Sequence, residues 1–302
     1  MKNHLNKGYL YVFAAGCLWG TLGLFVNLLG NYGISGGTVV FLRMTTATLW
    51  IVPFMLLTGG TKLFRIDRKG LLLCVVLGVI CQALFNYSYT EAINHIGVAT
   101  AAVLLYTSPV FVSIMSRIFF REAIGIRKVA GLIVNVIGCA LTVTGGNFTG
   151  VTIGYGVLIG IAAGFLYSLM TIFGTIAKDY DTTTVTFYSF LFAAIAMGIT
   201  ANPWSEVASA GSPAFFATAF AYGLITAVMA YFIYMKGLSM NLETSKVPVI
   251  ASVETIVAAV IGFAVFQEDL SLWKLTGIIL VLASIGIMNL GAAGKDASEE
   301  KN

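Results

Sequence analysis

Charged side chains are scarce in this sequence. Asp, Glu, Lys and Arg make up 10% of its 302 residues, whereas hydrophobic residues make up 58% and the mean hydropathy is +0.92. Because soluble domains carry about 25% charged residues, this chain lacks the polar groups needed to cover its surface in water. The composition excludes a water-soluble domain, and a net charge of +4 is too small to indicate nucleic-acid binding.

Groups that carry catalysis are also rare. The sequence has two histidines and shows no Walker, GxSxG or HExxH motif and no paired catalytic carboxylates. Its four cysteines, Cys17, Cys74, Cys81 and Cys139, lie in apolar runs without the spacing of metal ligands or disulfides. We therefore expect no enzymatic activity, no catalytic residue, no metal site and no cofactor.

What the sequence does contain is a series of apolar runs, each long enough to cross a bilayer core of about 30 Å. Short connections rich in Gly, Asn, Asp and Pro separate these runs, and none is long enough to hold a soluble domain. The sequence predicts ten transmembrane helices at 8–29, 35–57, 70–93, 97–119, 127–145, 153–177, 183–202, 214–236, 244–266 and 272–292.

The chain carries an internal duplication. Val98–Gly138 returns as 244–285, and each copy is an apolar run that ends in a glutamate, Glu122 or Glu268, followed by a polar turn and a second apolar run. The sequence therefore predicts two five-helix repeats around a central cavity. Their expected bounds are 1–148 and 149–294, followed by a disordered cytoplasmic tail, 295–302.

Lysine and arginine are distributed unevenly among the connections. They gather in the N-terminal segment, the C-terminal tail and the connections on the same side, whereas the other connections hold only Lys274 and Arg43 lies inside a span. The positive-inside rule places both termini in the cytoplasm. Because each repeat has five spans, the two repeats are inverted in the membrane, which permits alternating access.

Two charged residues fall deep inside spans. Burying a charge there costs about 2.5–3.5 kcal/mol, so Arg43 must face a partner, backbone carbonyls or water. Arg43 either braces neighbouring helix ends or takes part in the transport cycle. Glu254 lies well inside the ninth span, where it could bind a coupling proton or simply form a hydrogen bond to a neighbouring helix.

Deep aromatic and amide side chains occur at repeat-related positions, which favours a cavity over plain packing contacts between helices. Gln82, Asn86 and Tyr89 share one helical face, because their spacings are four and three residues. The predicted substrate-binding residues of this cavity are Trp19, Gln82, Asn86, Tyr89, Tyr106, Tyr167, Tyr231 and Tyr234.

Prolines and glycines mark places where spans bend or approach closely. Pro109 and Pro248 each remove a backbone donor from a span, so the predicted kinks could act as gates or as packing bends. Two ridges of small residues, Gly16–Gly20 and Gly156–Ser168, allow close contact between helices. We interpret these ridges as packing within one chain, and they could also serve a homodimer.

The sequence resembles the ten-helix EamA-type exporters of the drug/metabolite transporter superfamily. The resemblance rests on AAGCLWGTLGLF (Ala14–Phe25), FLR (Phe41–Arg43), LYTSPVFVSIMSRIFFRE from Leu105 and PVIASVETIVAAVIGFAVFQE from Pro248. It covers nearly the whole chain, although Tyr167 stands where a second Trp would match the first repeat, and Thr255 aligns with Pro109. The resemblance implies a central cavity and the movement of small metabolites across the cytoplasmic membrane.

We expect a secondary transporter that exports amino acids or similar amphipathic metabolites, driven by proton coupling or by exchange. The expected partners are a small-molecule substrate and the lipid bilayer. A multidrug or quaternary-amine exporter of the same fold fits the aromatic residues as well. An intramembrane lipid-handling enzyme would need further catalytic groups at depth, and a channel would not need inverted repeats.

Overall fold

The computed structural model describes residues 2–147, 154–267 and 271–299, so Glu268 lies outside the described part. Within this part the regular structure is entirely helical. Nine described helices are long and apolar enough to cross a membrane, and a shorter apolar helix, Leu272–Met288, provides the tenth span. The structure confirms the predicted all-α membrane fold.

The spans are assembled from consecutive helical segments. The first half contains α1 (Lys2–Trp19), α2 (Leu22–Gly30), α3 (Gly36–Thr58), the 3₁₀ helix η1 (Gly60–Phe64), α4 (Arg68–Val75), the π-helix η2 (Val76–Leu84), α5 (Phe85–Leu105), α6 (Ser108–Phe119) and α7 (Ile126–Thr144). The second half contains α8 (Tyr155–Ile176), the 3₁₀ helix η3 (Ala177–Asp179), α9 (Thr182–Thr200), α10 (Trp204–Ala210), α11 (Pro213–Tyr222), the π-helix η4 (Gly223–Met229), α12 (Ala230–Leu238), the 3₁₀ helix η5 (Thr244–Lys246), α13 (Val247–Ala251), α14 (Val253–Phe266) and α15 (Leu272–Glu299).

The C-terminal region differs from the prediction. Helix α15 continues to Glu299, where the sequence analysis expects a disordered tail from residue 295. Lys, Ala and Glu favour helix, and extending an existing helix costs far less than starting one. Residues 300–302 of the predicted tail lie outside the described part.

The same helix starts are built in both halves. Ser35 caps α3 by accepting a hydrogen bond from the Thr38 N–H, and Asp181 caps α9 by accepting one from the Thr184 N–H. Asp67 and Ser212 likewise cap α4 and α11, the first helices of the third and eighth spans. Each cap satisfies a backbone donor that the first helical turn leaves free.

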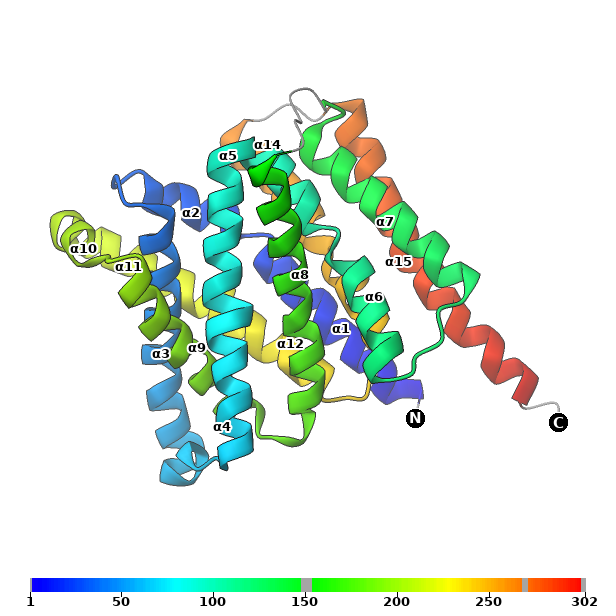
Figure 1. Ribbon diagram of the computed structural model, residues 1–302, viewed down its shortest axis with the longest axis horizontal. Coiled ribbons are helices and arrows are strands. Elements are labelled where there is room, and N and C mark those ends of the chain that lie inside the picture. The colour runs from blue at the N-terminus through cyan, green and yellow to red at the C-terminus, as the bar shows by residue number, and fades with distance from the viewer. Residues whose placement is uncertain (1, 148–153, 268–270, 300–302) are drawn as a thin grey trace.

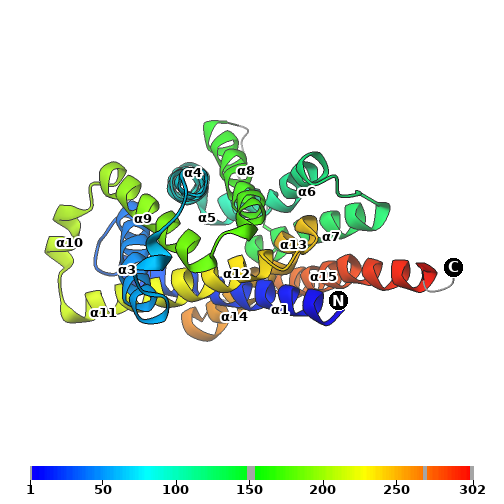
Figure 2. The same cartoon turned by 90° about the horizontal axis from the view of Figure 1, so that it is seen from below.

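Helices also pair across the halves (Figures 1 and 2). Contacts join α3 to α9 and α7 to α15, which are equivalent elements of the two repeats. In addition, α5 packs on α8, and α1 packs on α12 and α13, so each half reaches into the other in the same way. The start of α1 and the end of α15 both lie at the lower end of the molecule in Figure 1, as an even number of spans requires.

The two ridges of small residues contact other spans of the same chain. A Cβ on Gly16 would lie 2.6 Å from the Ala251 carbonyl oxygen, and a Cβ on Gly164 would lie 2.8 Å from the Leu104 carbonyl oxygen. These contacts agree with packing within one chain, because the missing side chains let backbones approach closely.

The two π-helices use glycine in the same manner. Gly78 of η2 packs against the Ser189 carbonyl oxygen of α9, and Gly223 of η4 packs against Thr46 and the Ala47 backbone nitrogen of α3. A Cβ at either position would overlap backbone or side-chain atoms of the opposite half. The central interface therefore depends on two equivalent glycines.

Gly78→Ala and Gly223→Ala should each destabilise the protein by about 1–3 kcal/mol, because overpacked helices must move apart. Gly286→Ala is the matched control, since no atom lies within 4 Å of its added Cβ and Ala favours helix. Thermal unfolding in detergent would measure all three variants. Equal melting temperatures would contradict this account of the interface.

Candidate functional site

Two spans break at equivalent positions near the centre of the molecule. The fourth span breaks at Tyr106 and Thr107, between α5 and α6, and the ninth breaks at Ser252, between α13 and α14. Tyr106 and Ser252 align in the two repeats. At each break a local hydroxyl donates to a carbonyl of the preceding turn: Thr107 to Leu104 at 2.6 Å and Ser252 to Val249 at 2.6 Å. Such bonds help to satisfy backbone groups that the bilayer cannot satisfy.

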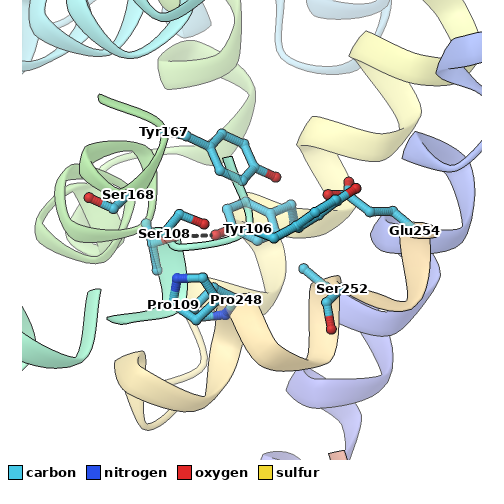
Figure 3. A pocket seen from close by; sticks show the side chains of 11 residues that line it. Tyr106, Ser108, Pro109, Tyr167, Ser168, Pro248, Ser252 and Glu254 are labelled. Carbon is cyan, nitrogen blue, oxygen red and sulfur yellow. Dashed lines mark hydrogen bonds between the residues drawn. The ribbon is translucent and has the colours of Figure 1, made fainter. Parts of the chain in front are cut away.

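A pocket lies between these two breaks (Figure 3). Its walls combine phenols, small hydroxyls and one carboxylate, and they come from both halves. The lining residues are Tyr106, Ser108, Pro109, Tyr167, Ser168, Thr171, Tyr234, Pro248, Ala251, Ser252 and Glu254. The cavity among them is about 10 Å³, which holds about one water molecule. A metabolite therefore requires these helices to separate before it can bind.

Four of the predicted cavity and charged residues meet here. Tyr106, Tyr167 and Tyr234 line the pocket together with Glu254, and Figure 3 shows Tyr167 and Glu254 reaching in from opposite walls. The Tyr234 hydroxyl lies 2.7 Å from the Thr171 hydroxyl, so its phenol is held in place. These groups can bind a small solute through hydrogen bonds, aromatic faces and one carboxylate.

Trp19 and Arg43 lie behind the Tyr234 wall instead of in the pocket. The Trp19 ring packs against Tyr234 with ring centroids 5.0 Å apart. Trp19 Nε1 donates to the Thr226 carbonyl oxygen at 3.1 Å, and an Arg43 guanidinium nitrogen donates to the same oxygen at 3.2 Å. Thr226 lies in the π-helix η4. Arg43 thus contacts a helix of the opposite half.

Arg43 also contributes positive charge near the centre. Its guanidinium lies over the Tyr222 ring at 5.9 Å from the centroid, and its Nε has no hydrogen-bond partner among the described residues. The positive charge of Arg43 is thus held inside the protein, beside an aromatic ring of the second half.

The remaining predicted cavity residues pack outside the pocket. The Gln82 amide nitrogen lies 3.5 Å from the Met170 sulfur, and the Asn86 amide donates to the Gln82 carbonyl at 2.6 Å. Tyr89 stacks on Phe85. Tyr231 is 1% exposed and its hydroxyl has no partner among the described residues. In this conformation these four side chains do not line the cavity.

The two prolines line the pocket but begin helices. Pro109 is the second residue of α6, and Pro248 is the second residue of α13. In the first helical turn a missing N–H breaks no helical hydrogen bond. The ninth span bends at Ser252, four residues beyond Pro248.

Sequence reasoning missed the small hydroxyls of the pocket, namely Ser108, Ser168, Thr171 and Ser252. The internal repeat could have identified Ser108 as a pocket residue, because Ser108 aligns with Glu254 of the second repeat. Ser168 and Thr171 lie one and four residues beyond Tyr167 on α8. Their role depends on the rotation of that helix, which sequence alone does not give.

A network of charges closes the end of the molecule that carries the N-terminus. The Glu122 carboxylate of the first half accepts hydrogen bonds from the Thr244 N–H, the Ser245 N–H and the Ser245 hydroxyl of the second half, at 2.6–3.1 Å. Lys128 pairs with Glu122 and with Glu243. We call this set the Glu122 network.

Glu243 links the same network to two further elements. Lys246 pairs with the Glu243 carboxylate at 2.7 Å, and the Tyr9 hydroxyl of α1 accepts a bond from the Glu243 N–H. Burial raises the pKa of the Glu243 carboxyl, but the bonds from Lys128 and Lys246 outweigh burial, so this pKa lies below its usual value. The network thus favours a charged Glu243.

The opposite end has a smaller closure between the halves. The Glu206 carboxylate of α10 accepts bonds from the Ser35 N–H at 2.8 Å and from the Ser35 hydroxyl at 3.0 Å. Trp204, also of α10, packs on Phe41 of α3 with ring centroids 5.4 Å apart. Contacts that cross between the halves are therefore present at both ends of the molecule.

Comparison with known proteins agrees with this architecture. A relative in Archaeoglobus fulgidus, named an uncharacterized transporter, is 27% identical over 286 residues and the match covers 93% of this chain and 96% of the relative. The uncharacterized inner membrane transporter YicL of Salmonella typhimurium is 25% identical, with 94% and 96% covered. The pseudopaline exporter CntI of Pseudomonas aeruginosa is 29% identical over 168 residues, covering 56% of each chain.

A solved crystal structure superimposes with a TM-score of 0.80 at 16% identity, and the match covers 95% of this chain and 98% of the other. That likeness concerns the fold alone. The model of the EamA-like transporter family matches the chain twice, over residues 6–144 and 154–290. The chain is a multi-pass membrane transporter that belongs to the EamA-like transporter family.

Proposed function

We propose that this protein is a secondary transporter that carries a small metabolite across the cytoplasmic membrane by alternating access. The observation that carries the proposal is the small pocket between two repeat-equivalent helix breaks, lined by residues of both halves. A pocket that must open before it can bind a metabolite suits a carrier, and the contacts between the halves at each end of the molecule are candidate closures. Inverted repeats give such a carrier two nearly equivalent arrangements.

The proposed substrate is an amino acid or a similar amphipathic compound. Glu254 can pair with an ammonium group, the rings of Tyr106 and Tyr167 can cover a cationic or apolar part, and Ser108 and Ser252 can bond polar oxygens. Export is the proposed direction, as in the Pseudomonas relative named an exporter. The same carboxylate and rings support the second candidate, a multidrug or quaternary-amine exporter.

The proposed energy source is an ion gradient or exchange. One charge that moves down the membrane potential supplies about 2.3 kcal/mol per 100 mV. Glu254 is the proposed coupling group because it is the one carboxyl group that lines the pocket. The lysine and arginine distribution supports cytoplasmic termini, so the Glu122 network is the proposed cytoplasmic gate.

Counterflow in proteoliposomes tests the transport proposal. Vesicles loaded with unlabelled amino acids or quaternary amines should accumulate the external labelled compound of one class in a saturable manner.

Glu254→Gln should abolish acceleration by a pH gradient and leave exchange intact, whereas Glu91→Gln, outside the pocket, should change neither. Flux without saturation would indicate a channel, product formation would indicate an enzyme, and retained acceleration would exclude Glu254 as the coupling group.

Glu122→Gln should open the gate at the Glu122 network. Bonds to a charged group contribute about 1.5–3 kcal/mol each, so losing the charge should raise the open population by about tenfold or more. Spin labels at Gly125→Cys and Lys236→Cys, with the four native cysteines replaced by Ala, would report the distance across this gate. Glu206→Gln, at the opposite end, is the control and should leave that distance unchanged; an equal effect would contradict the assignment.

The same distance should depend on pH. Because the pKa of Glu243 is lowered in the closed gate, its charge stabilises closure above the usual carboxyl value of about 4.3, and the stabilisation is lost as pH falls through the lowered pKa. The distance should stay short from pH 7 to 5 and lengthen below about pH 4. Glu243→Gln should remove this transition, and a transition that persists in the variant would show that another group controls it.

A further inference from the structure

An apolar groove of about 410 Å³ runs between α6 and α7, away from the central pocket. Both helices belong to membrane spans, so the groove faces the hydrocarbon of the bilayer. Its walls are branched aliphatic side chains with one hydroxyl. The lining residues are Val110, Ser113, Ile114, Ile124, Val129, Leu132, Ile133, Val136 and Ile137.

The groove has the dimensions of a binding site for a chain of methylene groups. Along α7 its lining extends from Val129 to Ile137, which is about 12 Å at 1.5 Å per residue. Ile114 and Ile133 are about half exposed although they line it, so no described part of the chain covers them fully. In a membrane, the molecules that lie against such a surface are lipid acyl chains.

Three exposed arginines lie at one end of this groove. Arg117 follows Ile114 by three residues on α6 and therefore continues the face that lines the groove. Arg121 and Arg127 flank Ile124, the groove residue in the connection between α6 and α7. The apolar groove thus ends in a cluster of positive charge.

The N-terminus of α7 adds donors beside these arginines. Gly125 occupies the N-cap position of this helix of 19 residues and provides no side-chain cap. The first N–H groups of a helix attract an anion such as phosphate when no side chain accepts from them. The arginines and this helix end therefore favour the same kind of ligand.

The backbone conformation at the end of α6 does not require arginine. Gln267 aligns with Arg121, and both residues have a positive φ of 56°. Arg117 aligns with Phe263 and Arg127 with Trp273. The three arginines are therefore not needed for this backbone conformation.

We propose that the α6–α7 groove binds one anionic phospholipid of the surrounding bilayer. Its acyl chain lies along the groove, and its phosphate contacts Arg117, Arg121 and Arg127 at the start of α7. The bound lipid holds the connection that carries Glu122, and so lies next to the gate without touching the central pocket.

Native mass spectrometry of the full chain tests this site with equal amounts of phosphatidylglycerol and phosphatidylcholine that bear the same acyl chains. The wild type should retain one phosphatidylglycerol in preference to phosphatidylcholine. Arg117→Gln/Arg121→Gln/Arg127→Gln should weaken this preference on the order of a hundredfold, since each basic residue near an anionic lipid contributes about 1 kcal/mol.

A matched variant tests whether the lipid preference depends on these three arginines or only on the total positive charge of the protein. Arg65→Gln/Arg68→Gln/Lys69→Gln removes the same charge from the end of the α3–α4 connection and the first turn of α4, which have no part in the groove, and should retain the preference. Ile133→Trp should fill the groove and reduce retention of both lipids. In the wild type, phosphatidylglycerol with a diazirine in its acyl chain should crosslink to α6 and α7, which tests the site without any substitution.

Several outcomes would overturn the proposal. These are equal retention of the two lipids by the wild type, equal loss in the two triple variants, or crosslinks that avoid α6 and α7. A dimer whose contact maps to the α6–α7 groove would show that a second copy of the chain occupies it.

Discussion

The structure depends on one constraint: every backbone group of a broken span must find its partner inside the protein, because hydrocarbon offers none. The Thr226 carbonyl of the π-helix η4 meets this constraint by accepting from both Trp19 and Arg43. These two donors come from the first half, and the acceptor belongs to the second. A charge that would be costly in lipid thus holds the halves together at the wall of the pocket.

The pocket and its closures follow from the same arrangement. Phenols, hydroxyls and Glu254 line one pocket beside the breaks at Tyr106 and Ser252, and at each break a local hydroxyl donates to a backbone carbonyl. The closures at the two ends are unequal. The Glu122 network joins several charges and three segments, whereas the Glu206 end uses one carboxylate and an aromatic contact. Separation at the Glu206 end therefore requires fewer ionic contacts to break.

Much of the architecture could be predicted from the sequence, because the lengths of the apolar runs and the internal duplication can be read directly from it. The positions of most spans agree with the prediction. The structure brings three of the predicted cavity residues, Tyr106, Tyr167 and Tyr234, to one pocket, where Glu254 joins them. Other features depend on helix rotation and on partners distant in sequence. Gln82 contacts Met170 and Tyr231 packs against Phe190. No local pattern identifies these partners, or Thr226 as the partner of Arg43.

The central claim is that the pocket faces one side of the membrane at a time. A single cysteine at Ser168, with the four native cysteines replaced, should react with a membrane-impermeant thiol reagent added to either side of oriented vesicles. A disulfide across the Glu122 network should abolish reaction from that side and preserve it from the other. Reaction from only one side in the unlocked protein, or loss from both sides after locking one end, would contradict alternating access.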